Sequence, residues 1–477
     1  MLTRIRLTSI LQSVRSGPGR AVISLRSEAT VNKNAVSTKP FENVPTRTGI
    51  YSWKYIGLIL QMKPFTKNSS YGEFVHGLHR EYGDIFKQRV GKGWVVYLFN
   101  PADIEVVLRE ESRYPYKSPL VLSSIFEKRK NIRPSLASLN GEEWRSRRQV
   151  AQEKMLRPAA VRNYAPLIND VADDFMVILK AEGRMKDTLR MMMSYATESI
   201  GMLCFNKRLG CLQRSRESDE LMFHVRQLFH QLADSNINEA LDRIQKSEEN
   251  QDEPNLLKEL LLDERIGPAD TQRVIMTLFN AGIESTSNNL TCFLYHLAKY
   301  PEVQDKLYNE VMTKMQSTDG NIDYSALNSM PYMTACVRES FRVIFPVMLG
   351  PLRIIEKPMV LGGYNIPSWT PIHLCSQIAC QDSRNFDGPT IFRPERWLRD
   401  ESGKRNIHPF VFLPFGFGVR NCLGQRFALQ EMYIFTAKLL KHFRLKLPPG
   451  TEEEDLQYHY KTFVLPSNTV DIILEER

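Results

Sequence analysis

The sequence predicts a mostly α-helical protein with a small β region, folded as one large domain. Several long segments carry apolar residues at intervals of three and four, which is the spacing of one helix face. Strand-like runs are few and short: "WVVYLF" at 94–99 and some pieces between about 350 and 375. From about residue 41 to the end of the 477-residue chain no low-complexity linker interrupts the pattern, so we expect 41–477 to form a single domain.

Four segments in the middle of the chain are predicted to be helices. Three of them show the 3/4 spacing of apolar residues: 141–155, 163–183 and 218–236. The fourth begins at the cap signal of Pro268 and Asp270 and ends at Tyr300, because Pro301 opens the next helix. With about 30 residues at a rise of about 1.5 Å each it would be roughly 45 Å long, enough to cross the whole domain.

The centre of this long helix is unusual, because "AGIESTSNN" places six polar residues in succession after an Ala-Gly pair. Gly282 in mid-helix costs about 1 kcal/mol relative to alanine and so requires a reason. One interpretation is a solvated stripe on a surface helix. The other is a buried helix that opens a groove at Gly282 and places an acid and hydroxyls beside a ligand. Small or polar residues share one helix face: Thr277, Ala281, Glu284 with Ser285, and Asn288.

The N-terminal segment 1–27 differs from the rest in charge. It holds five arginines and no acid, with apolar residues at helical spacing between them, which is the composition of a mitochondrial transit peptide. Its cleavage site is left open up to about residue 40. The alternative is a disordered basic arm that binds nucleic acid or membrane. Removal of 1–27 would take away five of the nine net positive charges, so the remaining chain does not favour a nucleic-acid partner.

The bulk composition is that of a globular protein, with 42% hydrophobic residues and a mean hydropathy of −0.33. No run approaches 18 uninterrupted apolar residues, so we expect a soluble or peripheral protein. The seven cysteines are odd in number and scattered, and none has zinc-ligand spacing. A reducing compartment without a disulfide framework is therefore expected.

One cysteine lies in a distinctive frame, "PFGFGVRNCLGQRF" at 414–427. A lone cysteine is most often a small buried apolar residue. Here, however, Phe415, Gly418, Arg420, Cys422 and Gly424 form the pattern F-x-x-G-x-R-x-C-x-G, which resembles the ligand loop of cytochromes P450. The resemblance implies that Cys422 binds the iron of haem b as a thiolate, and that glycines let the backbone aim N–H groups at the sulfur. It also implies that Phe415 packs on the loop and that Arg420 reaches a haem propionate.

Three further motifs extend the resemblance from about residue 41 to the C-terminus. Glu339 and Arg342 of "RESFR", with Arg396 of "FRPERW", resemble the family's buried Glu-Arg-Arg triad, which fixes structure. The alternative is an ordinary surface pair at i, i+3. Trp144 and Arg148 of "WRSRR" match the propionate-binding helix.

Arg353 of "GPLRIIE" matches a third propionate partner, and "AGIEST" resembles the family's oxygen-binding groove. The long helix is then expected to cross over the haem, with Ala281 in the groove. Ser285 stands where the family usually has threonine, and Thr286 follows. The resemblance implies that Glu284 and the hydroxyls of Ser285 and Thr286 deliver protons to bound oxygen.

The arginine-rich presequence and the quoted motifs look most like the mitochondrial class of the family. That class implies peripheral attachment to the matrix side of the inner membrane. It also implies electrons from NADPH through a flavin reductase and a 2Fe–2S ferredoxin of the adrenodoxin type. An acidic ferredoxin requires basic contacts, for which Arg338 and Arg426 are candidates, although Thr334 and Gln425 stand at positions that are often basic. Generic surface arginines are the alternative.

The implied activity is hydroxylation of a lipophilic molecule, such as a sterol, a secosteroid or a xenobiotic, with O2. Pocket walls are expected from 190–240 and from the loop at 345–352. Two other functions stay open: an isomerase or dehydratase on the same fold without a redox partner, and a haem-binding sensor without turnover. Electron supply of the microsomal type is a third possibility.

Overall fold

The computed structural model describes residues 38–49, 71–90, 93–118, 121–213, 239, 255–315, 322, 325–326, 329–399, 407–460 and 463–477. Every described residue belongs to one compact unit, Thr38–Arg477. The predicted transit segment 1–27 and the predicted helix 218–236 lie outside the described residues.

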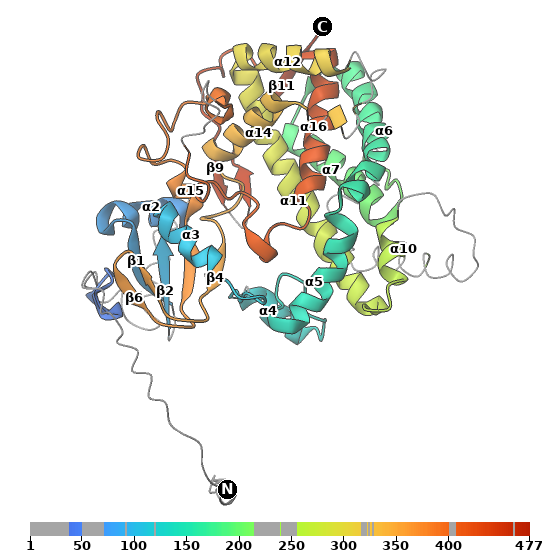
Figure 1. Ribbon diagram of the computed structural model, residues 1–477. Helices are drawn as coiled ribbons and strands as arrows, with labels where there is room; N and C mark the ends of the chain where they lie inside the picture. The colour runs from blue at the N-terminus through green and yellow to red at the C-terminus, as the bar shows by residue number, and fades with distance from the viewer. Residues whose placement is uncertain are drawn as a thin grey trace, which may run out of the picture. The chain divides into compact units, whose positions relative to one another are not determined.

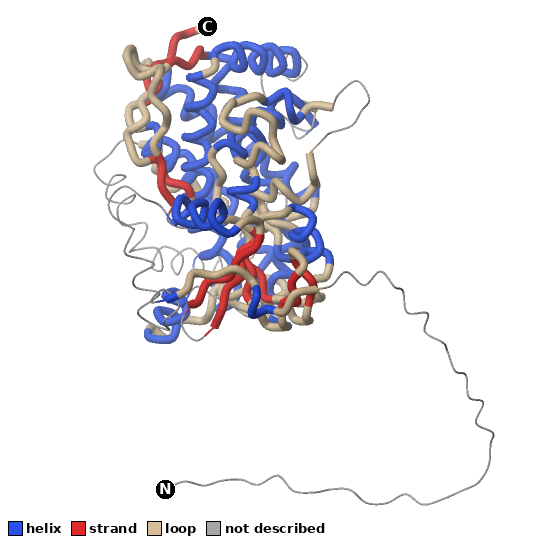
Figure 2. The backbone as a smooth tube through the Cα atoms, turned by 90° about the vertical axis from the view of Figure 1, so that its left-hand side faces the viewer, coloured by secondary structure: helices blue, strands red, loops and turns tan. Residues whose placement is uncertain are grey.

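The described part of the chain is mostly helical, with short strands beside the helices (Figure 2), so the predicted fold class is confirmed. Figure 1 labels most of these elements. The α-helices are α2 (Tyr71–Tyr82), α3 (Pro101–Arg109), α4 (Val121–Arg129), α5 (Gly141–Met155), α6 (Pro158–Glu182), α7 (Thr188–Phe205), α10 (Leu256–Leu261), α11 (Pro268–Lys299), α12 (Pro301–Met315), α14 (Pro331–Val343), α15 (Ser376–Ala379) and α16 (Gln425–His442). Short 3-10 turns are η1 (Phe41–Asn43), η3 (Pro394–Trp397) and η4 (Gly418–Arg420).

The helix boundaries follow the signals in the sequence closely. The predicted helix 141–155 is α5, and the long helix is α11, which begins with Pro268 in its first turn and ends one residue before Tyr300. The predicted helix 163–183 is α6, which begins earlier, at Pro158, because proline is favoured in the first helical turn. It ends where Gly183 adopts a φ of 64°, a left-handed conformation that glycine reaches without a steric penalty.

Within the described residues the strands form four small sheets. The largest has the order β1-β2-β7-β4, so strands within residues 85–98 lie beside strands within residues 352–374 (Figure 1). The predicted strand 94–99 is β2, and the pieces expected between 350 and 375 are β4 to β7. The strands are β1 (Ile85–Val90), β2 (Gly93–Leu98), β3 (Arg184–Met185), β4 (Leu352–Ile354), β5 (Met359–Leu361), β6 (Tyr364–Ile366), β7 (Pro371–Leu374), β8 (Phe443–Lys446), β9 (Tyr458–Tyr460), β10 (Val464–Pro466) and β11 (Ile472–Glu476).

Strand β1, which pairs antiparallel with β2, was not predicted from the sequence. Lys87 and Gln88 are buried in this strand, so the apolar/polar alternation of a half-buried strand is absent. Lys87 is accommodated because its Nζ donates hydrogen bonds to the carbonyl oxygens of Phe41 and Glu42, at 2.6 and 3.0 Å. The partners of this lysine are more than forty residues away, where a local pattern cannot show them.

The core is built around α11, which packs along α7 and also contacts α14 and α16 (Figure 1). The C-terminal half of α11 is buried without interruption from Thr286 to Ala298, in a cluster with α6, α7, α12, α14 and α16. Its N-terminal half packs in a second cluster with α5, α6, α7 and α10. The long helix is therefore a core helix and not a surface helix.

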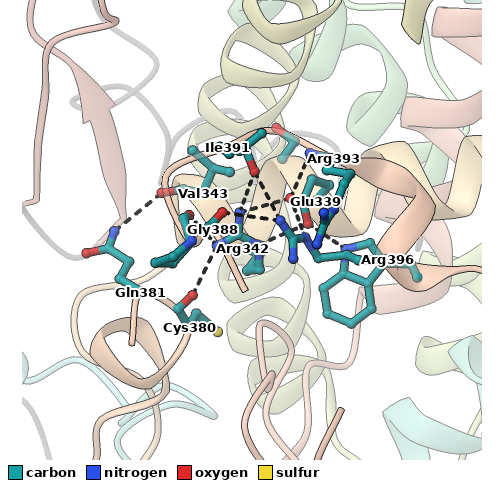
Figure 3. Close-up of polar contacts among 12 residues, drawn as sticks. Glu339, Arg342, Val343, Cys380, Gln381, Gly388, Ile391, Arg393 and Arg396 are labelled. Atoms are coloured by element: carbon teal, nitrogen blue, oxygen red, sulfur yellow. Dashed lines mark hydrogen bonds and ion pairs between the residues drawn. The ribbon is translucent and has the colours of Figure 1, made fainter. Parts of the chain in front are cut away.

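A buried charged network joins α14 to η3 (Figure 3). Glu339 and Arg342 are both fully buried, so this is not a surface pair, and Arg396 is nearly so. The Glu339 carboxylate accepts hydrogen bonds from both guanidinium groups at 2.9–3.0 Å, from the backbone N–H of Arg393 at 3.0 Å and from the indole N–H of Trp397 at 2.8 Å.

The two guanidinium groups also bind backbone carbonyls of the segment that precedes η3. Arg342 donates to the oxygens of Cys380, Pro389 and Ile391, and Arg396 to those of Asp387, Gly388 and Ile391. A segment without regular secondary structure is thereby fixed against α14, and every charge in the network has a partner.

Replacement of Glu339 by glutamine is expected to destabilise the protein by about 3–5 kcal/mol, because two buried guanidinium groups lose their counter-charge. Thermal or denaturant unfolding of the purified protein measures the change. The matched control is Arg393→Ala, which removes the side chain that pairs with Asp387 at the surface but keeps the backbone N–H bound to Glu339. The control is expected to lose less than about 1 kcal/mol. Equal losses in the two variants would contradict the role assigned to the buried carboxylate.

Candidate active site

The cysteine frame forms a tight loop that contains η4 and leads into α16. The backbone N–H of Cys422 donates to the carbonyl oxygen of Phe415 at 2.8 Å, which closes the loop. Gly416 and Gly418 have φ values of 72° and 69°, a region that side chains rarely tolerate. The phenyl ring of Phe415 meets that of Phe341 in α14 edge-on, with centroids 5.8 Å apart. The glycines of the motif therefore shape the loop, and Phe415 attaches it to the core.

Cys422 differs from the other cysteines. All seven lie among the described residues, and six are buried, whereas the side chain of Cys422 is exposed. Protein atoms nevertheless surround its sulfur closely, and this desolvation raises the pKa of the thiol. The backbone N–H groups of Gly424 and Gln425 and the charge of Arg148 act in the opposite direction, because each stabilises the thiolate.

Basic side chains from distant parts of the chain lie close to this loop. The Nη2 of Arg148 in α5 donates to the backbone and side-chain oxygens of Asn421, at 2.9 and 2.8 Å. The guanidinium of Arg420 lies over the ring of Trp144, 3.7 Å from its centroid, and donates to the backbone oxygens of Pro115 and Leu139. The predicted residues Trp144, Arg148 and Arg420 are thus brought together.

Arg353 of β4 joins the same group of basic residues. Its Nε donates to the carboxylate of Glu111, and its Nη2 lies 3.4 Å from the carbonyl oxygen of Phe417. Burial, with the repulsion of Arg353 and Arg148, lowers the pKa of Arg420 to about 9. This clustering of like charge out of water favours the binding of an anion.

Lys117, Arg148, Arg353 and Arg420 together form what we call the basic cluster. Lys117 and the neighbouring acid Glu111 were not predicted from the sequence. Burial, followed by the charges of Arg420 and Arg353, lowers the pKa of Lys117 to about 8. The side-chain amide of Asn140 links the backbone of Lys117 to the guanidinium of Arg420. Neither residue belongs to a recognised motif, so only the segment "EESRYPYKSP" with its closely spaced charges gave any signal.

The centre of α11 presents a solvent-accessible strip on a helix that is largely buried. Asn280 and Ala281 are exposed and Glu284 and Ser285 half-buried, whereas Thr286 is buried. The hydroxyl of Ser285 donates to the carbonyl oxygen of Ala281 at 2.6 Å, so it is turned toward its own helix. The small and polar face that the sequence indicated is therefore accessible in part, at Ala281, Glu284 and Ser285, whereas Asn288 of the same face is buried.

Gly282 has a different reason from the one expected. A Cβ at this position would lie 2.9 Å from Cδ1 and 3.0 Å from Cγ1 of Ile200 in α7. Any side chain at this position would displace Ile200, so Gly282 allows the close packing of α7 on α11. This packing gives a reason for glycine other than the expected groove. The expected pocket walls are described in part, by α7 and by residues 345–352, and the rest of 190–240 lies largely outside the described residues.

The two candidate contacts for a redox partner lie on different helices. Arg338 of α14 is half-buried, with its guanidinium 5.4 Å from the ring centroid of Trp397, and Arg426 of α16 is exposed. A hydrogen bond of 3.4 Å between Tyr433 and Thr334 joins the same two helices. The two arginines thus belong to neighbouring helices.

The donor set fits a haem group. One accessible thiol receives two backbone N–H groups, and four basic side chains beside it suit the two propionates of a haem. None of the helices that the structure describes combines the length and the apolar character required to cross a bilayer.

Comparison with known proteins agrees with this chemistry. The family model of cytochrome P450 matches residues 48–223 and 216–474. A probable cytochrome P450 of Caenorhabditis elegans is 26% identical over 493 residues, covering 93% of this chain and 97% of the relative. The mitochondrial sterol 26-hydroxylase of Homo sapiens is 29% identical over 420 residues, with 78% of each chain covered. The mitochondrial 1,25-dihydroxyvitamin D(3) 24-hydroxylase of Mus musculus is 26% identical, covering 90% of this chain and 89% of the relative.

The fold and the site thus define a haem-thiolate protein, and the match over most of its length shows that this chain belongs to the cytochrome P450 family. It is a monooxygenase with haem b, bound through a cysteine thiolate, as its cofactor. The resemblance to the mitochondrial class is also confirmed, since several relatives carry that location in their names.

Replacement of Gly282 by valine is expected to destabilise the protein by about 1–3 kcal/mol through overpacking between α7 and α11. Thermal unfolding measures the loss. The control is Gly77→Val in α2, where a Cβ would have no neighbour within 4 Å, so only helix propensity changes. In a double-mutant cycle, Ile200→Ala should relieve much of the cost of Gly282→Val. Additive effects of the two substitutions would contradict the close-approach explanation.

Proposed function

We propose that the chain hydroxylates a lipophilic small molecule, of the sterol, secosteroid or xenobiotic kind, in mitochondria. O2 is the oxidant, and NADPH supplies electrons through a flavin reductase and a 2Fe–2S ferredoxin of the adrenodoxin type. The observation that carries the proposal is Cys422. Of the seven cysteines it is the exposed one, and two backbone N–H groups and a guanidinium favour its thiolate.

In this proposal Cys422 ligates the haem iron, and Phe415 packs against the loop and keeps water from it. Bound haem supplies the activation of O2 and the insertion of one oxygen atom into a C–H bond. The charge of Arg148 and the N–H groups of Gly424 and Gln425 stabilise the thiolate form and so oppose the desolvation of the sulfur. These groups are fixed before any substrate arrives, so they need no reorganisation during turnover.

The basic cluster holds the haem propionates. Arg148, Arg353 and Arg420 provide the charges, and Trp144 supports Arg420 by stacking against its guanidinium. Lys117, which no motif indicated, belongs to the same group because its ammonium is affected by the charges of Arg420 and Arg353. Two carboxylates from a ligand would relieve the repulsion among these cations.

The strip on α11 would deliver protons. Glu284 and Ser285 are reachable from solvent, and Thr286 lies buried directly after them. The Oγ of Ser285 donates to the oxygen of Ala281, so a rotation about one bond would redirect its proton away from the helix. A hydroxyl that alternates between two acceptors is suited to hold and pass on a proton.

The redox partner and the location follow from the same argument. Arg338 and Arg426 would contact an acidic ferredoxin, because charge complementarity speeds the encounter of soluble redox proteins. Residues 1–27 would direct the chain to the mitochondrion, and residues from about 41 to 477 would form the catalytic domain. The protein would attach peripherally to the matrix side of the inner membrane, as the mitochondrial class implies.

The first test is the difference spectrum of dithionite-reduced protein with and without carbon monoxide. Wild type is expected to show the strongly red-shifted Soret band of a haem thiolate, and Cys422→Ala to lose it. Cys211→Ala is the control, since it removes a buried thiol from a different part of the core and should keep the band.

An unshifted, histidine-type band in wild type, or a red-shifted band that survives Cys422→Ala, would overturn the assignment. Reconstitution with ferredoxin, its reductase and NADPH then separates the remaining functions. A monooxygenase consumes NADPH and releases a hydroxylated product. An isomerase turns over without NADPH, and a sensor forms no product under either condition. Activity supported only by the microsomal reductase would exclude the ferredoxin route.

Replacement of Ser285 by alanine is expected to lower the product formed per NADPH by about tenfold or more, because the hydroxyl that relays the proton is lost. Hydrogen peroxide release should rise correspondingly, and both are measured in the reconstituted system. Ser285→Thr keeps the hydroxyl and adds a methyl group that restricts its rotamer, so it should couple at least as well as wild type. Unchanged coupling in Ser285→Ala would remove Ser285 from the relay.

A further inference from the structure

Glu111 is an acid inside the basic cluster. It follows α3 by two residues, and its carboxylate accepts a hydrogen bond from the Nε of Arg353. The side chains of Glu111 and Arg353 are only 10% and 6% exposed. Desolvation raises the pKa of Glu111, and the charges of Arg353 and Arg420 act against this shift, so the charged form of this shielded carboxylate depends on its partners.

The same carboxylate lies against the cysteine loop. A Cβ at Gly418 would be 3.0 Å from the Oε2 of Glu111, and Gly418 has a positive φ of 69°. On the other side of the pair, the Nη2 of Arg353 lies 3.4 Å from the carbonyl oxygen of Phe417. Glu111 and Arg353 thus contact two successive residues of the loop, four and five positions before Cys422.

The charges of the cluster do not balance without an anionic ligand. Lys117, Arg148, Arg353 and Arg420 carry four positive charges, and Glu111 is the carboxylate that acts on both Arg353 and Arg420. The formal charge is then +3, and two haem propionates would reduce it to +1. Without the charge of Glu111 the haem-bound site would have a formal charge of +2.

A second acid, Glu356, lies nearby but does not replace Glu111. Its Oε1 accepts from the hydroxyl of Ser112 at 2.5 Å in a more exposed position, and its charge raises the pKa of Glu111. Both acids line a cleft of about 400 Å³, on which Glu110 also lies. Of these three acids, Glu111 is the one whose carboxylate accepts a hydrogen bond from a residue of the basic cluster, Arg353.

We propose that Glu111 is a positioning residue for the haem. Its carboxylate holds the guanidinium of Arg353 against the cysteine loop, and its negative charge lowers the reduction potential of the bound haem. The inference rests on the proposed haem site. A negative charge near the haem disfavours the ferrous form, which carries one electron more, and burial keeps solvent from screening this effect.

The test is the midpoint potential of the ferric–ferrous couple, measured by spectroelectrochemical titration of the holoprotein. Glu111→Gln keeps the shape and a hydrogen-bond acceptor but removes the charge. It is expected to shift the equilibrium about tenfold toward ferrous, which for one electron corresponds to about 59 mV.

The matched control is Glu110→Gln, which removes the same charge one residue away. Glu110 pairs with Lys357, and the two side chains are 49% and 59% exposed, so solvent screens the pair. This variant is expected to leave the potential unchanged. A shift of equal size in both variants, or none in Glu111→Gln, would overturn the inference.

A second variant addresses the hold on Arg353. Glu111→Asp keeps the charge but withdraws the carboxylate, so it should release haem to apomyoglobin several-fold faster with a nearly unchanged potential. It also serves if Glu111→Gln does not yield holoprotein, and an unchanged rate of haem release would then overturn the inference. If wild type lacks the thiolate Soret band, the proposed function itself fails. If the band is present and the Glu111 variants change neither the midpoint potential nor the rate of haem release, only this inference fails.

Discussion

The arrangement around Cys422 depends on one electrostatic constraint: a thiolate has to be stabilised where protein atoms have displaced water. Desolvation raises the pKa of this thiol, as it does for the buried cysteines elsewhere in the chain. Only at Cys422 do backbone N–H groups of the following turn and the guanidinium of Arg148 together oppose it. The loop can offer those N–H groups because glycines let it fold back on Phe415.

The surrounding core serves to hold this loop and the accessible strip of α11 in place. The Glu339 network ties α14 to an irregular segment, and α14 in turn carries Phe341, against which Phe415 packs. Gly282 allows α7 to approach α11 where the strip begins. Each of these contacts fixes the elements that it joins in one geometry, which is what a site for a rigid planar cofactor requires.

The basic cluster carries a net positive charge that an anionic ligand can balance. Four cations come from the segment after α3, from α5, from β4 and from the cysteine loop, and the single carboxylate of Glu111 offsets only part of their charge. The four cations therefore repel one another, and an anionic group relieves this repulsion when it binds. Membership of the cytochrome P450 family identifies that group as haem.

The sequence by itself determined what depends on local spacing: the bounds of α5 and α11, the mostly helical class and the frame of Cys422. It left open which face of α11 is covered, because periodicity shows that polar residues share a face but not what packs on the others. Only the tertiary structure decided that, and it also supplied Lys117, Glu111, β1 and the contact between Gly282 and Ile200. These features depend on partners tens to hundreds of residues away, whose charge and volume no local pattern encodes.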